Sequence, residues 1–227
     1  MRTERLAAAS GAGFVAAAII GNAMETSGIR GTLLDHLRAG RSPVQATGLV
    51  LELVGFALSL VFLGYLYRVQ REAEAPGGWA ASAAFGAGLV ATAIKLGSAS
   101  AVVAAYYRAD ALSPELARTL DDLNGGAFVV SGFAYGLFVA LAAGSALGSR
   151  GLPRWLAIGG LVAGVLATAA GVAGVLDPAG FVAVPFMLCL VWILVTGIVL
   201  TVRRPELPTR IAERAPDPVA AEPTASA

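Results

Sequence analysis

Two stretches decide the fold of this chain: GGAFVVSGFAYGLFVALAAGSALGS at 125–149 and PAGFVAVPFMLCLVWILVTGIVLTV at 178–202. Neither contains a charged residue. Each is long enough for a helix to cross about 30 Å of hydrocarbon, since such a crossing takes about 20 apolar residues. The two stretches therefore predict transmembrane helices at about 125–148 and 179–202.

Four further stretches have the same character, with at most one charged residue in each: 6–24, 44–67, 79–105 and 154–176. The whole chain is 57% hydrophobic and 14% charged, against about 45–50% and 25% in soluble domains. A chain of 227 residues cannot hide that much apolar surface in one soluble core. We expect an all-α integral membrane protein, a bundle of six transmembrane helices formed by residues 1–204.

Arginine placement predicts the orientation, because cytoplasmic segments are enriched in Lys and Arg. With the N-terminus inside, ten arginines fall on the cytoplasmic side and five on the outer side, where six acidic residues accompany them. Both termini are then cytoplasmic, and the chain is placed in the inner membrane of a bacterial cell. In an alternative, 6–24 is a cleaved secretory signal, which leaves the later spans in the same orientation.

The segments between the spans carry signals of their own. Ser42-Pro43-Val44-Gln45 reads as a capping box with proline at the first helical position. Asp177-Pro178 predicts a similar helix start, and Pro185 a bend two turns later. Two short amphipathic helices are expected in the outer loops, at 32–40 and at 113–124. Residues 205–227, rich in Pro, Ala and charge, are expected to form a disordered cytoplasmic tail.

Several kinds of site are excluded by residue counts. Cys189 is the only cysteine and His36 the only histidine, so disulfides, thiolate clusters and two-histidine metal or haem sites cannot be built. The sequence has no phosphate-binding loop and no GxSxG elbow, and a net charge of +1 gives no reason to expect nucleic acid. We therefore expect no metal, no cofactor and no enzymatic activity.

One constellation stands out inside the spans. Glu52 and Lys95 are single charges in consecutive helices, and a charge at the centre of a membrane helix costs about 2.5–3.5 kcal/mol even on the lenient insertion scale. At 1.5 Å per residue, Glu52 lies ~12 Å and Lys95 ~14 Å from the outer ends of their spans. Antiparallel neighbours therefore bring the two to the same level.

Both charges lie on helix stripes of small and weakly polar residues, which include Gly48 and Ser59 beside Glu52, and Gly88 and Thr92 beside Lys95. Such stripes face other helices. We expect a direct or water-bridged ion pair, with Asn22 and Tyr135 as further polar partners. The pair either orients the two helices or forms a functional site open to the outside. A proton relay would need further ionisable groups in series, and no third intramembrane charge is present.

Small residues one turn apart occur at Gly132 and Gly136, Gly144 and Gly148, and Gly160 and Gly164. This spacing lets helix backbones approach closely. It favours packing within the chain, with a homodimer through the same faces as the alternative.

The stretch from Leu123 to Leu156 carries a resemblance. It runs from Leu-Asn-Gly-Gly-Ala-Phe at 123–128 through an apolar helix to the basic turn Ser-Arg-Gly-Leu-Pro-Arg-Trp-Leu at 149–156. In this it resembles a family of small multi-pass membrane proteins of actinobacterial type, classed as a domain of unknown function. The resemblance covers about a third of the chain and implies a helical membrane fold, but no activity.

These observations leave three hypotheses. The first is a small-solute or proton-coupled carrier with Glu52 and Lys95 in its site. The second is a membrane-bound sensor or accessory subunit that presents its outer helices or cytoplasmic tail to a protein partner. The third, an intramembrane enzyme, would need a pocket with more polar side chains than these.

Overall fold

The computed structural model describes residues 2–26, 42–177 and 182–202. It contains six long helices and, in the described part of the chain, no strand: α1 (Arg2–Glu25), α3 (Pro43–Ala73), α4 (Ala80–Tyr107), α5 (Pro114–Ser149), α6 (Arg154–Leu176) and α7 (Val184–Val202). A single 3-10 turn, Ala109–Ala111, joins α4 to α5. All six helices are long and apolar enough to cross a membrane. The structure thus confirms the six-helix membrane bundle.

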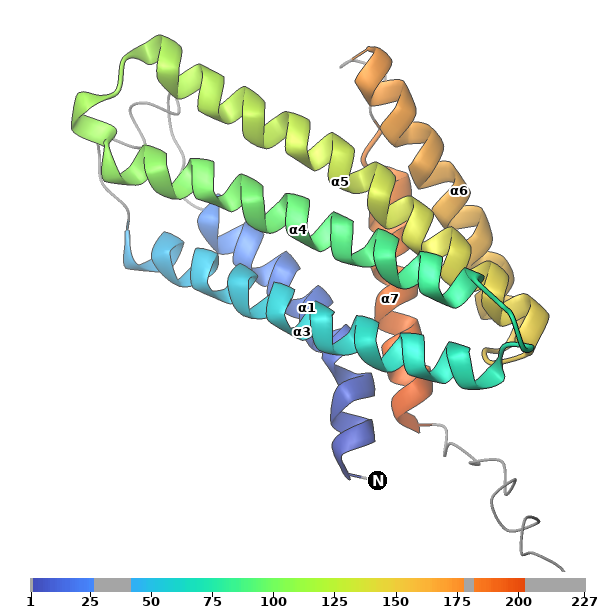
Figure 1. Ribbon diagram of the computed structural model, residues 1–227. Helices are drawn as coiled ribbons and strands as arrows, with labels where there is room; N and C mark the ends of the chain where they lie inside the picture. Colours follow the sequence, from blue (N-terminus) through green and yellow to red (C-terminus); the bar gives the residue numbers. More distant parts are fainter. Residues whose placement is uncertain (1, 27–41, 178–181, 203–227) are drawn as a thin grey trace, which may run out of the picture.

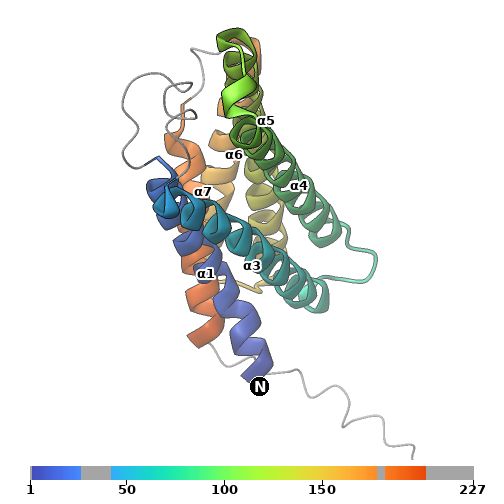
Figure 2. The same cartoon turned by 90° about the vertical axis from the view of Figure 1, so that its left-hand side faces the viewer.

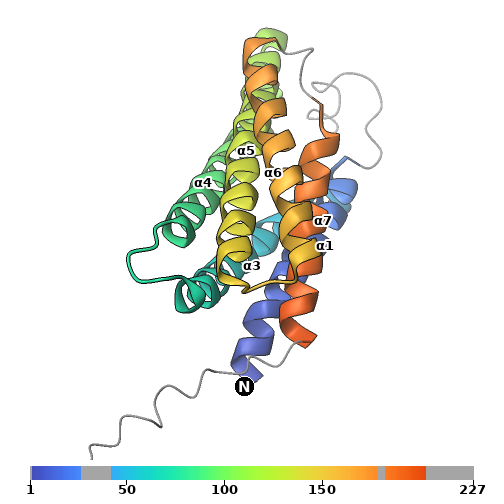
Figure 3. The same ribbon diagram turned by 90° about the vertical axis from the view of Figure 1, so that its right-hand side faces the viewer.

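The helices form a closed ring of neighbours. Each packs against the next along the chain, and α7 returns to pack against α1 (Figure 1). Figure 2 shows the side formed by α1 and α3, with α4 beside them, and Figure 3 shows the opposite side, where α6 and α7 lie next to α5. This arrangement places the interior of the bundle between helices from both ends of the sequence.

The bundle has two faces of different charge. The face that carries the start of α1 and the end of α7 holds six arginines of the described chain: Arg2, Arg5, Arg68, Arg71, Arg150 and Arg154. We call it the arginine face. The opposite end, here the acidic face, holds the carboxylates Glu25, Asp110, Glu115, Asp121, Asp122 and Asp177. The two ends of the bundle thus differ in the sign of the charge that prevails there.

Helix α3 begins as the sequence predicted. The Ser42 side chain accepts a hydrogen bond from the Gln45 backbone N–H at 3.3 Å, and the Gln45 side chain accepts one from the Ser42 N–H at 3.0 Å. This capping box, with Pro43 as the first helical residue, fixes the position of α3 nine residues before Glu52.

The second short amphipathic helix predicted in the outer loops is wrong as a separate element. Residues 114–124 are the first three turns of α5, which passes through Asn124-Gly125-Gly126 without a break. Leu112 and Ala117 bury against Ala105 of α4, and this small cluster holds the start of α5 to the end of α4. The first amphipathic helix, at 32–40, and the tail at 205–227 lie outside the described residues.

Helix α7 also differs from the prediction. It begins at Val184, so Pro185 lies in its first turn. Proline fits there because the first backbone N–H groups of a helix have no partner within it. Pro185 therefore starts α7 and does not bend it. Residue 178, the proline of the predicted helix start, lies outside the described residues.

Glycines permit the closest helix crossings. A Cβ on Gly136 of α5 would lie 2.7 Å from Thr168 Oγ1 and 2.8 Å from Gly164 O of α6, and one on Gly160 of α6 would collide with the Trp192 indole of α7. These glycines therefore serve packing within the chain, as the sequence favoured. In contrast, a Cβ on Gly144 would meet nothing within 4 Å. A homodimer through such open positions stays a prediction.

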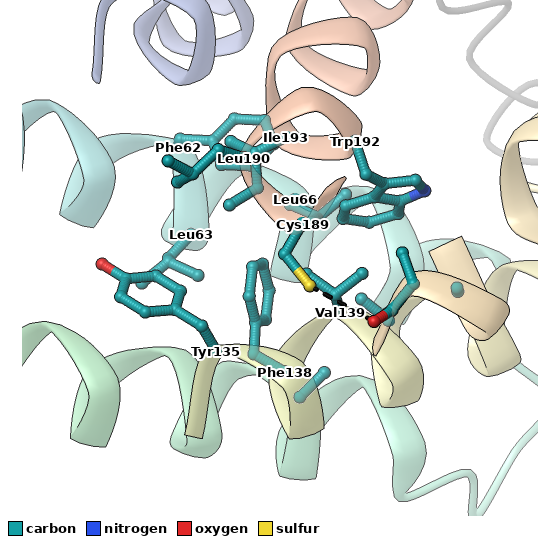
Figure 4. Close-up of a cluster of buried hydrophobic side chains, with 14 of the residues drawn as sticks. Phe62, Leu63, Leu66, Tyr135, Phe138, Val139, Cys189, Leu190, Trp192 and Ile193 are labelled. Carbon is teal, nitrogen blue, oxygen red and sulfur yellow. Dashed lines mark hydrogen bonds between the residues drawn. The ribbon is translucent and has the colours of Figure 1, made fainter. Parts of the chain in front are cut away.

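A dense apolar layer fills the bundle toward the arginine face. Figure 4 shows its side chains, which include Phe62, Leu63, Leu66, Phe138 and Ile193, each 3% exposed or less. Two of its polar side chains donate to backbone carbonyls, whereas the buried Thr196 hydroxyl has no hydrogen-bond partner among the described residues. Trp192 Nε1 donates to Leu156 O at 2.9 Å, and Gln70 Nε2 donates to Ala142 O at 2.7 Å. We call this layer the apolar plug.

Candidate intramembrane binding site

Three of the predicted polar residues, Asn22, Glu52 and Lys95, meet between α1, α3 and α4 in the half of the bundle toward the acidic face, and Tyr135 reaches the same space from α5. Helices α1 and α3 approach closely here because Gly21 and Gly48 face each other. A Cβ on Gly21 would lie 2.8 Å from both Gly48 O and the Glu52 side chain. The contact sets Asn22 beside Glu52, where its amide is placed to hydrogen-bond the carboxyl group. Lys95 of α4 interacts electrostatically with Glu52 from across the bundle.

Glu52 and Lys95 do not form the direct ion pair that the sequence allowed. The salt bridges among the described residues lie at the arginine face, where Arg68 pairs with Glu4 and Glu72, and Arg71 with Glu74. The Lys95 ammonium lies instead over the Phe128 ring, 5.2 Å from its centroid, which is the distance of a cation–π contact. The two charges are therefore held apart with open space between them.

That space includes an inner cavity of about 260 Å³ whose lining contains Asn22, Glu52, Lys95 and Tyr135. Five aromatic rings in its wall contact one another in series. Phe128 packs on Phe186 with centroids 5.1 Å apart, Phe186 on Tyr135 at 5.8 Å, Tyr135 on Phe14 at 6.3 Å, and Phe14 on Phe56 at 6.2 Å. We call these five residues the aromatic cage.

A second cavity, of about 210 Å³, lies on the other side of the same charges, toward the acidic face. It shares Asn22, Glu52 and Lys95 with the inner cavity. The rest of its lining is more polar and includes Glu25, Thr26, Ser98, Asp121 and Asn124. Thr26 and Asp121 are exposed, so this outer cavity reaches the surface of the bundle. The three shared residues stand at the junction between a polar entrance and an aromatic interior.

Tyr135 is buried at the bottom of the inner cavity, with 2% of its surface exposed. Its hydroxyl lies 3.5 Å from Thr92 Oγ1, which in turn lies 3.4 Å from Ser59 Oγ. Thr92 and Ser59 each donate their proton to a carbonyl of their own helix, Gly88 O and Phe56 O. The series of hydroxyls stops there, because the buried side chains that follow Ser59 on α3 are Phe62, Leu63 and Leu66 of the apolar plug.

The structure confirms that the stripes beside the two charges face helix neighbours. Gly48 meets α1, Gly88 meets Leu63 and Phe138, and Thr92 and Ser59 meet each other. Sequence reasoning named Tyr135 but missed the four phenylalanines of the aromatic cage. Only Phe56, one turn after Glu52 on the same helix face, carried a local signal. Phe14 and Phe186 reach the cavity from helices far away in the sequence.

In the described part of the chain, no group of three or more His, Cys, Asp or Glu residues could hold a metal ion. Comparison with protein-family models, curated proteins and solved structures finds no significant match. What the site can do must therefore be argued from its own geometry. It offers one anionic, one cationic and one amide group next to an aromatic cavity, whose lining also includes Ile19 of α1 and Met187 of α7, 54% and 44% exposed.

Proposed function

We propose that this protein binds a small solute inside the membrane, at the junction formed by Asn22, Glu52 and Lys95, and that it acts as a carrier whose acidic face is open in this structure. The observation that carries the proposal is that two cavities meet at these three side chains. Ligand sites in proteins are concave, mostly apolar, and contain a few polar groups that fix orientation. The inner cavity matches that description.

Closure of the bundle toward the arginine face supports a carrier in one of its two states. The outer cavity reaches the surface at the acidic face, whereas Phe62, Leu63 and Phe138 close the route to the arginine face. A carrier must later open the opposite side, while its site stays near the middle of the membrane. By the positive-inside rule the open side faces away from the cytoplasm.

Solute movement is a better fit than proton movement. The hydroxyl series from Tyr135 ends at Ser59, and the plug residues that follow on α3, Phe62, Leu63 and Leu66, carry no ionisable group. Proton pathways need groups that accept and release protons in series. The proposal therefore concerns binding and passage of a solute, without chemical conversion.

Cysteine accessibility tests the proposal. In a Cys189→Ala background, Ala99→Cys places a thiol in the outer cavity and Ala18→Cys places one in the inner cavity. Both should react with a charged, membrane-impermeant thiol reagent added from the acidic-face side. The matched control is Val165→Cys on α6, a helix that lines neither cavity, where the side chain is 54% exposed on the outer surface of the bundle. It should stay unreactive in lipid. Unreactive thiols at both cavity positions would contradict the proposal.

A second candidate function, a receptor that binds the solute without moving it, is favoured by the continuity of α5. This helix runs unbroken from Phe128 at the cavity to Pro114 at the acidic face. The two functions predict different results for Ser59→Cys. Ser59 lies between the inner cavity and the apolar plug and is 3% exposed. A carrier makes this thiol reactive from the arginine-face side when the bundle opens there, whereas a receptor leaves it protected from both sides.

A further inference from the structure

The two charges of the site face a shared space and leave it open, and this arrangement bears on the chemistry of the solute. A Glu and a Lys in a low-dielectric interior attract each other strongly. Here Lys95 is turned onto the Phe128 ring, and Glu52 is approached by Asn22. Glu25, in the lining of the outer cavity, also acts electrostatically on Lys95. Both charges line the two cavities, where a ligand can reach them.

On this basis, and resting on the binding function proposed above, we infer that the ligand is a small zwitterion with one apolar body. Its ammonium group binds Glu52, its anionic group binds Lys95, and its apolar body fills the aromatic cage. The cationic, anionic and apolar parts of the ligand thus correspond to Glu52, Lys95 and the aromatic cage.

Charge balance is the first argument. Glu52 and Lys95 are the only charged side chains in the lining of the inner cavity, so that lining is neutral overall, whereas Glu25 and Asp121 line the outer cavity alone. A ligand with a net charge would pair with one of them and leave the other stranded beside it. Once a bound ligand fills the cavities, a charge left unpaired beside it is desolvated, which is costly, whereas a ligand that pairs with both charges removes that cost.

The position of Asn22 is the second argument. Its amide lies beside Glu52 and in the lining of both cavities. An amide offers two donors and an acceptor, so it can bind an ammonium and a carboxylate of the same molecule. A purely cationic or purely anionic ligand would use only half of that capacity.

The aromatic cage is the third argument, because it defines the rest of the ligand. Phe14, Phe56, Phe128 and Phe186 have no polar atoms, and the Tyr135 hydroxyl is directed to Thr92. Aromatic walls of this kind accept a flat ring or a branched chain by edge and face contacts. A volume of about 260 Å³ is slightly below the usual 300–1,000 Å³ of ligand pockets, so the apolar body is small.

Three probes with the same phenyl body and different charge test the inference: L-phenylalanine, phenethylamine and 3-phenylpropionate. Binding to the full-length protein in lipid nanodiscs is measured by isothermal titration calorimetry. We expect L-phenylalanine to bind at least tenfold more tightly than either singly charged probe. A further comparison uses Lys95→Met and Lys95→Arg. Lys95→Met should weaken L-phenylalanine binding at least tenfold and Lys95→Arg should retain most of it, with Glu72→Gln at the arginine face as the neutral control.

Other outcomes would overturn the inference. If phenethylamine binds as tightly as L-phenylalanine, the site recognises only the cationic group and Lys95 takes no part in binding. If none of the three probes binds while Ala18→Cys and Ala99→Cys react as expected, the accessible site stands but the ligand class is wrong. Unreactive thiols would instead remove the binding function itself, so the two failures are distinguishable. Light scattering and thermal unfolding of each variant verify that it is folded.

Discussion

The two halves of this bundle are built from the same helices, but one half is densely packed and the other encloses cavities. Toward the arginine face, α3, α5 and α7 meet through Phe62, Phe138 and Ile193, which are almost completely buried. Toward the acidic face the same helices separate around two cavities lined by Glu52 and the aromatic cage. The contrast shows how a single chain holds polar groups inside a membrane. Dense packing in one half holds the helices together, and the other half encloses cavities that contain the charged side chains.

The largest loss of stability in the packed half is expected at the crossing of α5 and α6. Gly136→Val would place side-chain atoms against the backbone of Thr168 and Gly164. Overpacking typically costs about 1–3 kcal/mol, and a clash with backbone lies at or above the top of that range. The variant should lose most of its folded fraction in detergent, measured by fluorescence-detected size exclusion. Gly144→Val, on the same helix where a Cβ meets nothing within 4 Å, is the matched control and should behave like the parent.

A smaller effect is expected inside the packed half at Trp192. Trp192→Phe keeps an aromatic ring but removes the Nε1 donor to Leu156 O. The net loss of one buried hydrogen bond is about 0.5–1.5 kcal/mol. The thermal unfolding midpoint should fall accordingly, and Trp155→Phe, where the parent side chain is 63% exposed, should leave it unchanged. Equal midpoints for the two variants would show that the indole bond contributes nothing.

The smallest stability effects are expected at the charges of the open half. Since Glu52 and Lys95 face cavities and make no direct salt bridge, Glu52→Gln, Lys95→Met and the double variant should each stay within about 1 kcal/mol of the parent, the range of surface ion pairs. A directly paired buried couple behaves differently: breaking it costs about 3–5 kcal/mol, and removing both partners is often nearly neutral. Unfolding curves with that second pattern would mean that the charges close on each other and that the open half is structural.

Much of the fold follows from the sequence because its signals are local. Uncharged stretches of spanning length predict helices, and Ser42 with Gln45 predicts a helix start. The failures have equally physical causes. The start of α5 was read as a separate helix because Asn124-Gly125 resembles a helix end, whereas Leu112 and Ala117 hold the segment to α4 through contacts that no local pattern reveals.

The site was predicted where polar side chains interrupt the apolar helices, which also drew attention to Asn22 and Tyr135. A single charge in an apolar helix stands out, so Glu52 and Lys95 were identified and brought to one level by helix geometry. The four phenylalanines of the aromatic cage were not predicted, because in a membrane helix a phenylalanine that faces a cavity and one that faces lipid give the same apolar pattern. Nor could the sequence distinguish a direct pair from two charges held apart, since that depends on the ring of Phe128 and on the close approach at Gly21.

The length of α5 has a mechanical consequence. The helix crosses α6 at Gly136 and continues past the cavity to Pro114 at the acidic face. From the crossing to that end is about 33 Å at 1.5 Å per residue, so a tilt of about 5° about the crossing displaces the end by roughly 3 Å. Phe128, part of the cavity wall, lies on the same helix between the crossing at Gly136 and the end at Pro114. A small adjustment of the wall around a solute is thereby amplified into a larger displacement of the carboxylates that surround the entrance.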